Sequence, residues 1–87
     1  MRRSLMSEVG EITVRYWAAA RAATGVDAEQ VRGTTVGAVV DAAVARHPDL
    51  SRVARVATLL LDGRAVSRDA PVLVGATLEV LPPFAGG

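Results

Sequence analysis

Two stretches of alternating apolar residues, one near each end of an 87-residue chain, leave few ways to build a core. In the first stretch Ile12, Val14 and Tyr16 alternate with more polar residues, and residues 77–81 alternate in the same way. Period-two alternation with β-branched residues is typical of strands that bury one face. We therefore expect a strand at each end of a single small domain.

The apolar residues between these strands follow a helical period instead. From Val36 to Val44 they recur at i, i+3, i+4, i+7 and i+8, which places them on one face of a helix. Thr35 is a suitable N-cap, and Pro48 ends the helix. His47 lies in the last turn, where its interaction with the helix dipole is favourable. Because β-branched residues are poor helix formers, this helix needs a sheet to pack against.

Shorter signals occupy the rest of the chain. Residues 18–25 predict a helical turn that ends at Gly25 in a left-handed conformation. Residues 27–32 predict a short second strand that closes a hairpin with the first. Residues 50–56 add another helical turn.

A second hairpin follows this turn. Residues 58–61 form a brief apolar run that ends at Asp62-Gly63, a strong turn signal, and Ala65-Val66 predicts a short strand after it. The order of elements is therefore strand, turn, strand, helix and three further strands. This order predicts an α+β fold of the β-grasp (ubiquitin-like) type, a mixed sheet with one main helix packed across one face. The two terminal strands would lie parallel at its centre.

The composition narrows the possible functions. All ten basic residues are arginine, and the chain contains neither lysine nor cysteine. Without cysteine there are no disulfides, thiolate metal sites or cysteine nucleophiles. The net charge of +1 gives no reason to expect nucleic-acid binding, which usually shows as a clustered basic face. No segment approaches the ~20 apolar residues of a membrane span, so we expect a cytoplasmic protein without membrane or nucleic-acid partners.

The chain divides into three parts. Residues 1–10 are expected to form a flexible tail, in which Glu8 interrupts any apolar stretch of signal-peptide length and Met6 is an alternative start. Residues 11–81 form the predicted β-grasp domain. Residues 82–87 form an extended C-terminal tail ending in Gly-Gly.

This tail is the predicted working end. It reads Leu81-Pro82-Pro83-Phe84-Ala85-Gly86-Gly87. Two prolines donate no backbone hydrogen bonds to a sheet and hold the exit extended. Two terminal glycines have no side chains, which suits entry into a narrow channel of a partner. Elsewhere the carboxylates show no ligand-like spacing and no glycine-rich phosphate loop is present, so we expect no active site or metal site within the chain itself.

The stretch from Ile12 to Gly87 resembles the small subunits of molybdopterin synthase, within the MoaD/ThiS family of sulfur carriers. The family has a first strand ending in paired aromatics and alanine, a hairpin that is usually Asn-Gly, and a Pro-Pro-x-x-Gly-Gly ending. The matching segments here are Val14-Arg15-Tyr16-Trp17-Ala18, Arg21, Gly25, Leu61-Asp62-Gly63 and the tail from Leu81 to Gly87. Residues 75–77, Gly-Ala-Thr, depart from the more common Asp-Gly-Asp, but only in a surface turn.

The resemblance implies a mechanism. A ubiquitin-activating-type adenylyltransferase would use ATP to adenylate the carboxylate of Gly87, and a sulfur donor enzyme would convert it to a thiocarboxylate. The tail would then enter the large subunit of molybdopterin synthase, with Gly86 letting it reach the site. There the sulfur would pass to a cyclic pterin precursor in molybdenum cofactor biosynthesis. On this reading the chain binds no cofactor and is no enzyme on its own, but the sulfur-donating subunit of a transferase complex.

Strand parity predicts which side chains contact partners. Leu59 and Leu61 should face the core, whereas Leu60, Leu81 and Trp17 should fall on the opposite, helix-free face. Exposed apolar groups clustered on one face commonly mark a partner surface, although these could also cover one another or lie under the N-terminal tail. Phe84 lies beyond the last strand and is expected to be an interface anchor. The predicted partner-binding residues are Trp17, Arg21, Leu60, Leu81, Pro82, Pro83, Phe84, Ala85 and Gly86.

Two other functions remain open at this point. A carrier feeding thiazole, cysteine or another thiolated product would share the diglycine end. A ubiquitin-like modifier or plain interaction domain would use the same fold, with its tail joined to lysines or inert. The Pro-Pro-Phe-Ala lead-in favours the molybdopterin synthase subunit.

Overall fold

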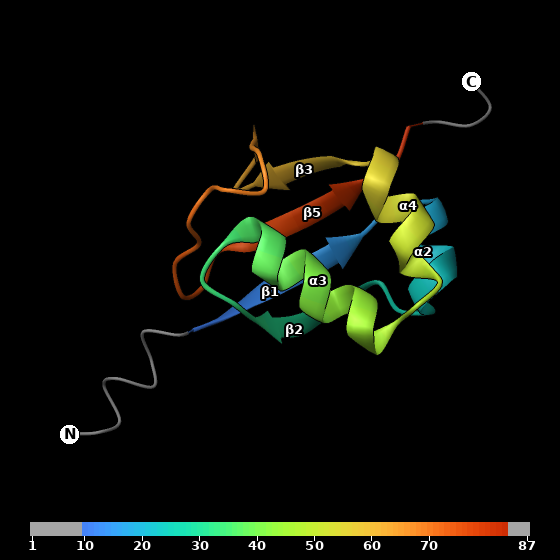
Figure 1. Cartoon of the computed structure of the whole chain (residues 1–87), viewed down its shortest axis with the longest axis horizontal. Coiled ribbons are helices and arrows are strands. Elements are labelled where there is room, and N and C mark those ends of the chain that lie inside the picture. Colours follow the sequence, from blue (N-terminus) through green and yellow to red (C-terminus); the bar gives the residue numbers. More distant parts are fainter. Residues whose placement is uncertain (1–9, 84–87) are drawn as a thin grey trace.

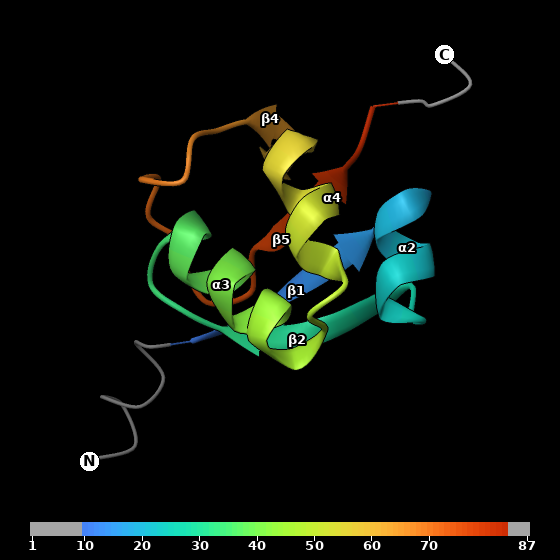
Figure 2. The same cartoon turned by 45° about the vertical axis from the view of Figure 1, so that its right-hand side comes forward.

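The structure, a computed structural model, describes residues 10–83 as five strands and three helices. The strands are β1 (Glu11–Tyr16), β2 (Ala28–Arg32), β3 (Thr58–Leu61), β4 (Arg64–Ala65) and β5 (Thr77–Leu81), and the helices are α2 (Ala19–Thr24), α3 (Val36–Arg46) and α4 (Leu50–Val56). The strands form one mixed sheet in the order β2-β1-β5-β3-β4. The helices lie together on one face of this sheet (Figures 1 and 2). The predicted β-grasp arrangement is confirmed.

The terminal strands β1 and β5 lie parallel at the centre of the sheet, as predicted. Their register pairs Val14 with Leu78 and Tyr16 with Val80. All four side chains are buried beneath the helices, because alternate residues of paired strands point to the same face. The residues between them necessarily point to the opposite face.

The helices form where local signals predicted them. Thr35 caps α3, its Oγ1 accepting a hydrogen bond from the backbone N–H of Ala38 at 3.1 Å. Gly25 ends α2 at φ 79°, and its N–H donates to the carbonyl of Arg21. The core beneath the helices is built mainly from valine, with Leu50 contributed by α4. Buried apolar area therefore holds these short helices in place.

The hairpin between β3 and β4 differs from the prediction by one residue. Asp62 and Gly63 both have positive φ, 49° and 88°, as in the tight two-residue turns that suit the twist of a hairpin. Leu61 therefore pairs directly with Arg64, so β4 begins at Arg64 rather than at Ala65. Asp62 also accepts a hydrogen bond from the backbone N–H of Thr77 at 2.9 Å, which joins the turn to the start of β5.

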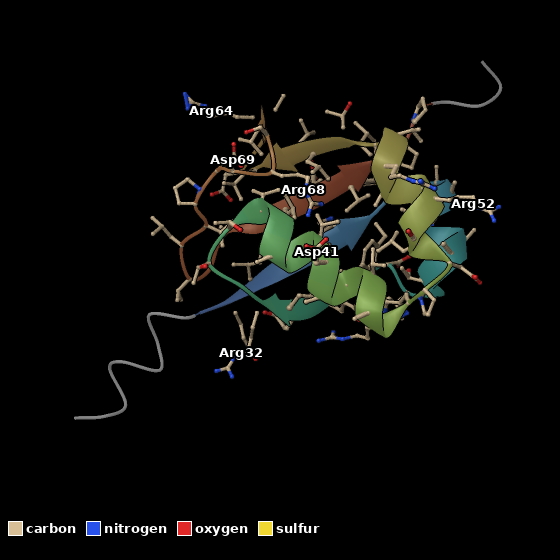
Figure 3. The ribbon with its side chains drawn as sticks, in the orientation of Figure 1. Arg32, Asp41, Arg52, Arg64, Arg68 and Asp69 are labelled. Carbon is tan, nitrogen blue, oxygen red and sulfur yellow. The ribbon has the colours of Figure 1, made fainter. Side chains whose placement is uncertain are left out.

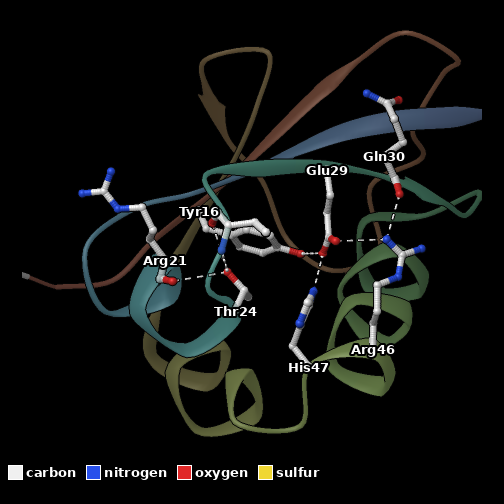
Figure 4. A network of polar contacts seen from close by, with 8 residues as sticks. Tyr16, Arg21, Thr24, Glu29, Gln30, Arg46 and His47 are labelled. Atoms are coloured by element: carbon white, nitrogen blue, oxygen red, sulfur yellow. Dashed lines mark hydrogen bonds and ion pairs between the residues drawn. The ribbon is translucent and has the colours of Figure 1, made fainter.

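A network of polar side chains holds the end of α3 against the sheet (Figure 4). The carboxylate of Glu29 on β2 accepts a hydrogen bond from the Tyr16 hydroxyl at 2.6 Å and lies 2.8 Å from Nε2 of His47. Its other oxygen lies 3.1 Å from the guanidinium of Arg46. His47 thus has a specific partner on the sheet in addition to its position at the helix end, which sequence patterns did not predict.

The network changes the proton affinity of two of its members. Burial raises the pKa of Tyr16, and the hydrogen bond to Glu29 raises it further. Burial alone would raise the pKa of Glu29, but hydrogen bonds from Tyr16, Arg46 and His47 outweigh it and lower that pKa. Glu29 is therefore held as a carboxylate that three donors share.

Candidate functional site

The root of the tail is Pro82, the residue that directly follows the central strand β5. β5 ends at Leu81, opposite Thr58 of β3. Pro82 follows the parity of the strand and is buried, whereas Pro83 is exposed. The domain therefore packs around the first residue of the predicted tail, and the second lies at its surface. Phe84, Ala85, Gly86 and Gly87 lie outside the described residues, so their roles stay predictions.

The helix-free face carries the predicted apolar residues. Leu59 and Leu61 pack against the core, and Leu60 between them does not. Leu60 and Leu81 are half-buried, and Trp17 is 38% exposed. The predicted separation of the two faces is confirmed. That this face contacts a partner stays a prediction.

A tight turn positions Trp17 at the tail end of this face. The backbone N–H of Ala20 donates to the carbonyl of Trp17 at 2.9 Å, so residues 17–20 form a turn between β1 and α2. Ala18, inside the turn, has φ 47° and ψ −120°. A residue with a Cβ is strained there, by about 1–2 kcal/mol. Alanine gives no signal for this conformation, so the sequence did not reveal it.

Arg21 does not join the other predicted partner residues. It lies on α2, and its guanidinium pairs with the carboxylate of Asp27 at 3.1 Å. Both side chains are largely exposed, so this ion pair contributes little to stability. The structure therefore places Arg21 on a helix and Trp17, Leu60 and Leu81 on the helix-free face.

On the helical side, polar side chains converge in the Glu29 network at the end of α3, and that carboxylate already has three partners there. An open groove of about 610 Å³ has Val40, Val44 and Leu59 among its lining residues. Arg68 and Asp41 also line it and form an ion pair at 2.8 Å (Figure 3). Among residues 10–83, no polar or charged residue is fully buried and no three metal-binding side chains cluster. Within the same range, no helix combines the length and apolar character needed to cross a membrane.

These features define a class of protein: a β-grasp domain whose central strand delivers a C-terminal segment to the surface. The chain is similar to small archaeal modifier protein 1 (SAMP1) of Haloferax volcanii, with a TM-score of 0.82 and 28% identity over 90% of this chain and 100% of that chain. It is similar to a chain in the BexX/CysO complex of Amycolatopsis orientalis, with a TM-score of 0.76 and 27% identity over 87% of this chain and 99% of that one.

A third neighbour shares the fold. It is the putative molybdopterin converting factor subunit 1 of Pyrococcus furiosus, with a TM-score of 0.76 and 24% identity over 86% of this chain and 99% of that one. The comparison with curated proteins gives no match. Residues 14–87 match the ThiS family. The chain therefore belongs to the ThiS family of sulfur carriers.

Proposed function

We propose that this protein carries sulfur as a thiocarboxylate on Gly87 and delivers it to the large subunit of molybdopterin synthase. Membership of the ThiS family supports a carrier role. The tail from Leu81 to Gly87, which matches the Pro-Pro-x-x-Gly-Gly ending, is the observation that favours this acceptor. The exposed Pro83 at the end of the central strand supports a tail that is available to a partner.

The proposed chemistry needs activation, because a carboxylate is a poor electrophile. The Gly87 carboxylate attacks the α-phosphorus of ATP in the adenylyltransferase, which releases pyrophosphate and leaves an acyl adenylate. A sulfur donor enzyme then supplies sulfur at the oxidation level of sulfide, which attacks the acyl carbon, displaces AMP and leaves a thiocarboxylate. Its ionised sulfur is the nucleophile that the large subunit directs to the cyclic pterin precursor. The acid, base and electrostatic groups for that transfer come from the large subunit.

The composition suits an activated acyl group. With neither cysteine nor lysine in the chain, no thiol or side-chain amine of the carrier itself can capture the acyl adenylate. The domain supplies the remaining requirements, a firmly packed root at Pro82 and an apolar face beside it. We propose that Trp17, Leu60 and Leu81 contact both partners in turn, while Phe84 anchors the tail in each channel.

A second candidate function is sulfur delivery to another acceptor. In the same group of alternatives, the protein is a modifier that becomes joined to other proteins. The likeness to SAMP1 and to a chain of the BexX/CysO complex, at 28% and 27% identity, favours this alternative specifically. The two candidates share the activation step and differ in the acceptor.

Reconstitution tests the proposed acceptor. The thiocarboxylated protein is mixed with the host's large synthase subunit and cyclic pterin precursor, and conversion of the precursor is followed by mass spectrometry. The expected result is transfer of sulfur from the wild-type protein and none from a variant lacking Gly87, although both fold. Transfer to a thiazole or cysteine precursor instead, or isopeptide conjugates on cellular proteins, would assign the second candidate.

A further inference from the structure

Two opposite charges lie side by side at the centre of the helix-free face. Arg15 on β1 is the register partner of Glu79 on β5. The residues on either side of each are buried against the helices, so parity directs both charged side chains to the other face. Leu60 is the register partner of Glu79 on its other side, so this pair borders the apolar residues of the face.

Arg15 and Glu79 do not neutralise each other. Four ion pairs within 4.0 Å occur among residues 10–83, and neither residue takes part in any of them. Arg15 lies instead over the ring of Trp17, with 5.2 Å between its guanidinium carbon and the ring centroid. Such a cation–π contact orders the guanidinium without cancelling its charge.

A partner that covers this face must offer a group of opposite charge to each of these two residues. Covering Trp17 and Leu60 removes water from Arg15 and Glu79, and an unpaired charge in a dry interface is costly. A partner with a carboxylate facing Arg15 and a cationic group facing Glu79 avoids that cost. A surface with the reversed pattern is repelled.

We propose that Arg15 and Glu79 determine which adenylyltransferase recognises this carrier. The matching surface of the adenylyltransferase is an apolar hollow, with an acidic group facing Arg15 and a basic group facing Glu79. This inference rests on the proposed function and names the recognition elements of its first step. The adenylyltransferase is the partner that meets the chain before any sulfur is attached. It therefore cannot select the carrier by its thiocarboxylate, and selection falls to the tail sequence and this face.

ATP–pyrophosphate exchange with the adenylyltransferase of the same organism tests the proposal. The variants are R15E, E79R and the double variant R15E/E79R. Each single reversal is expected to raise KM for the carrier about tenfold, through slower association. The kcat should stay unchanged, because neither residue touches the reacting carboxylate. Thermal melts check that each variant folds. If E79R is unstable, Glu79→Gln replaces it, with a smaller expected rise in KM.

The double variant decides the role of the pair. It has the same net charge as the wild type, but the partner's charges are unchanged, so its KM should stay raised. If Arg15 and Glu79 interact only with each other and not with the partner, the double variant will recover the wild-type KM and the proposal is wrong.

Arg52 on α4, on the helical side of the sheet, provides the matched control (Figure 3). R52E makes the same change in net charge as R15E and is expected to keep the wild-type KM. An equal rise in KM for R52E would show a general charge effect and overturn the proposal. A wild-type protein that supports no exchange at all contradicts the proposed function itself, and this inference with it.

Discussion

The backbone N–H of Trp17 donates to the carbonyl of Val80 at 3.2 Å, just beyond the last pair of the central parallel ladder, Tyr16 with Val80. This hydrogen bond joins the aromatic residue of the helix-free face to the strand that leads into the tail. Because this hydrogen bond ties the end of β1 to β5, Trp17 and the end of β5 keep a fixed relation. A partner that binds Trp17 therefore meets Pro82, the first residue of the tail, at a defined position.

Replacing Ala18 with glycine should stabilise the domain. Ala18 has φ 47°, a conformation that glycine adopts without strain. Relief of that strain, less the greater flexibility of glycine in the unfolded chain, should raise the free energy of unfolding by about 1 kcal/mol. Urea denaturation measures the change. Ala22→Gly, at an exposed position in α2, is the control and should lower it by about 1 kcal/mol. Equal losses for both variants would mean that Ala18 is not strained.

Serine substitutions at Leu60 and Leu61 should separate the two faces of β3. Leu61 packs against the core, so Leu61→Ser should lower the free energy of unfolding by about 2 kcal/mol. Leu60→Ser should cost less than about 1 kcal/mol, because Leu60 lies on the helix-free face. Paired urea titrations compare them. Equal sensitivity would show that the helix-free face is covered in the free protein.

The Glu29 network should make stability depend on pH in the acid range. Hydrogen bonds from Tyr16, Arg46 and His47 outweigh the effect of burial and lower the pKa of Glu29. The folded state therefore binds this proton less readily than the unfolded state. The stabilisation is present above the ordinary pKa of 4.5 and is lost as pH falls through the lower folded value.

Unfolding of the wild type and of Glu29→Gln between about pH 7 and about pH 3 measures this contribution. The wild type should be the more stable protein near neutrality, and the difference should shrink on acidification below the ordinary pKa. A difference that stays constant over this range would mean that Glu29 does not titrate with a lowered pKa.

Gly86→Val should leave the fold intact and block activation. Gly86 follows the domain in the sequence, so a valine side chain at this position is not expected to affect the core. A branched side chain does not fit a channel shaped for bare backbone. Thermal melting checks the fold, and pyrophosphate exchange with the adenylyltransferase checks activation. Normal exchange by this variant would show that the tail does not enter a narrow channel.

The regular elements of the fold could be predicted because their signals are local. Alternation in residues 11–16 and 77–81 predicted the two central strands and their buried faces, and Thr35 predicted the start of α3. The start of β4 at Arg64 was missed by one residue, because only the left-handed geometry of Asp62 and Gly63 sets where pairing resumes.

Other features depend on residues that are distant in the sequence. The hydrogen bonds of Glu29 reach 13 residues back to Tyr16 and 18 residues on to His47, and no sequence period joins these positions. The pairing of Arg15 with Glu79 likewise appears only when the register of β1 and β5 is known. The predicted roles of Phe84 to Gly87 come from the tail motif and from family resemblance.

Intact-mass measurement of the protein purified from its own host tests the carrier function most directly. The expected species has one oxygen replaced by sulfur, and fragmentation should place the change on Gly87 as the terminal residue. This species should disappear when the adenylyltransferase gene is deleted, and when the chain is extended by one residue past Gly87. A protein that carries no sulfur at Gly87 under conditions of active cofactor synthesis, or that carries it elsewhere, would show that Gly87 is not the sulfur-carrying residue.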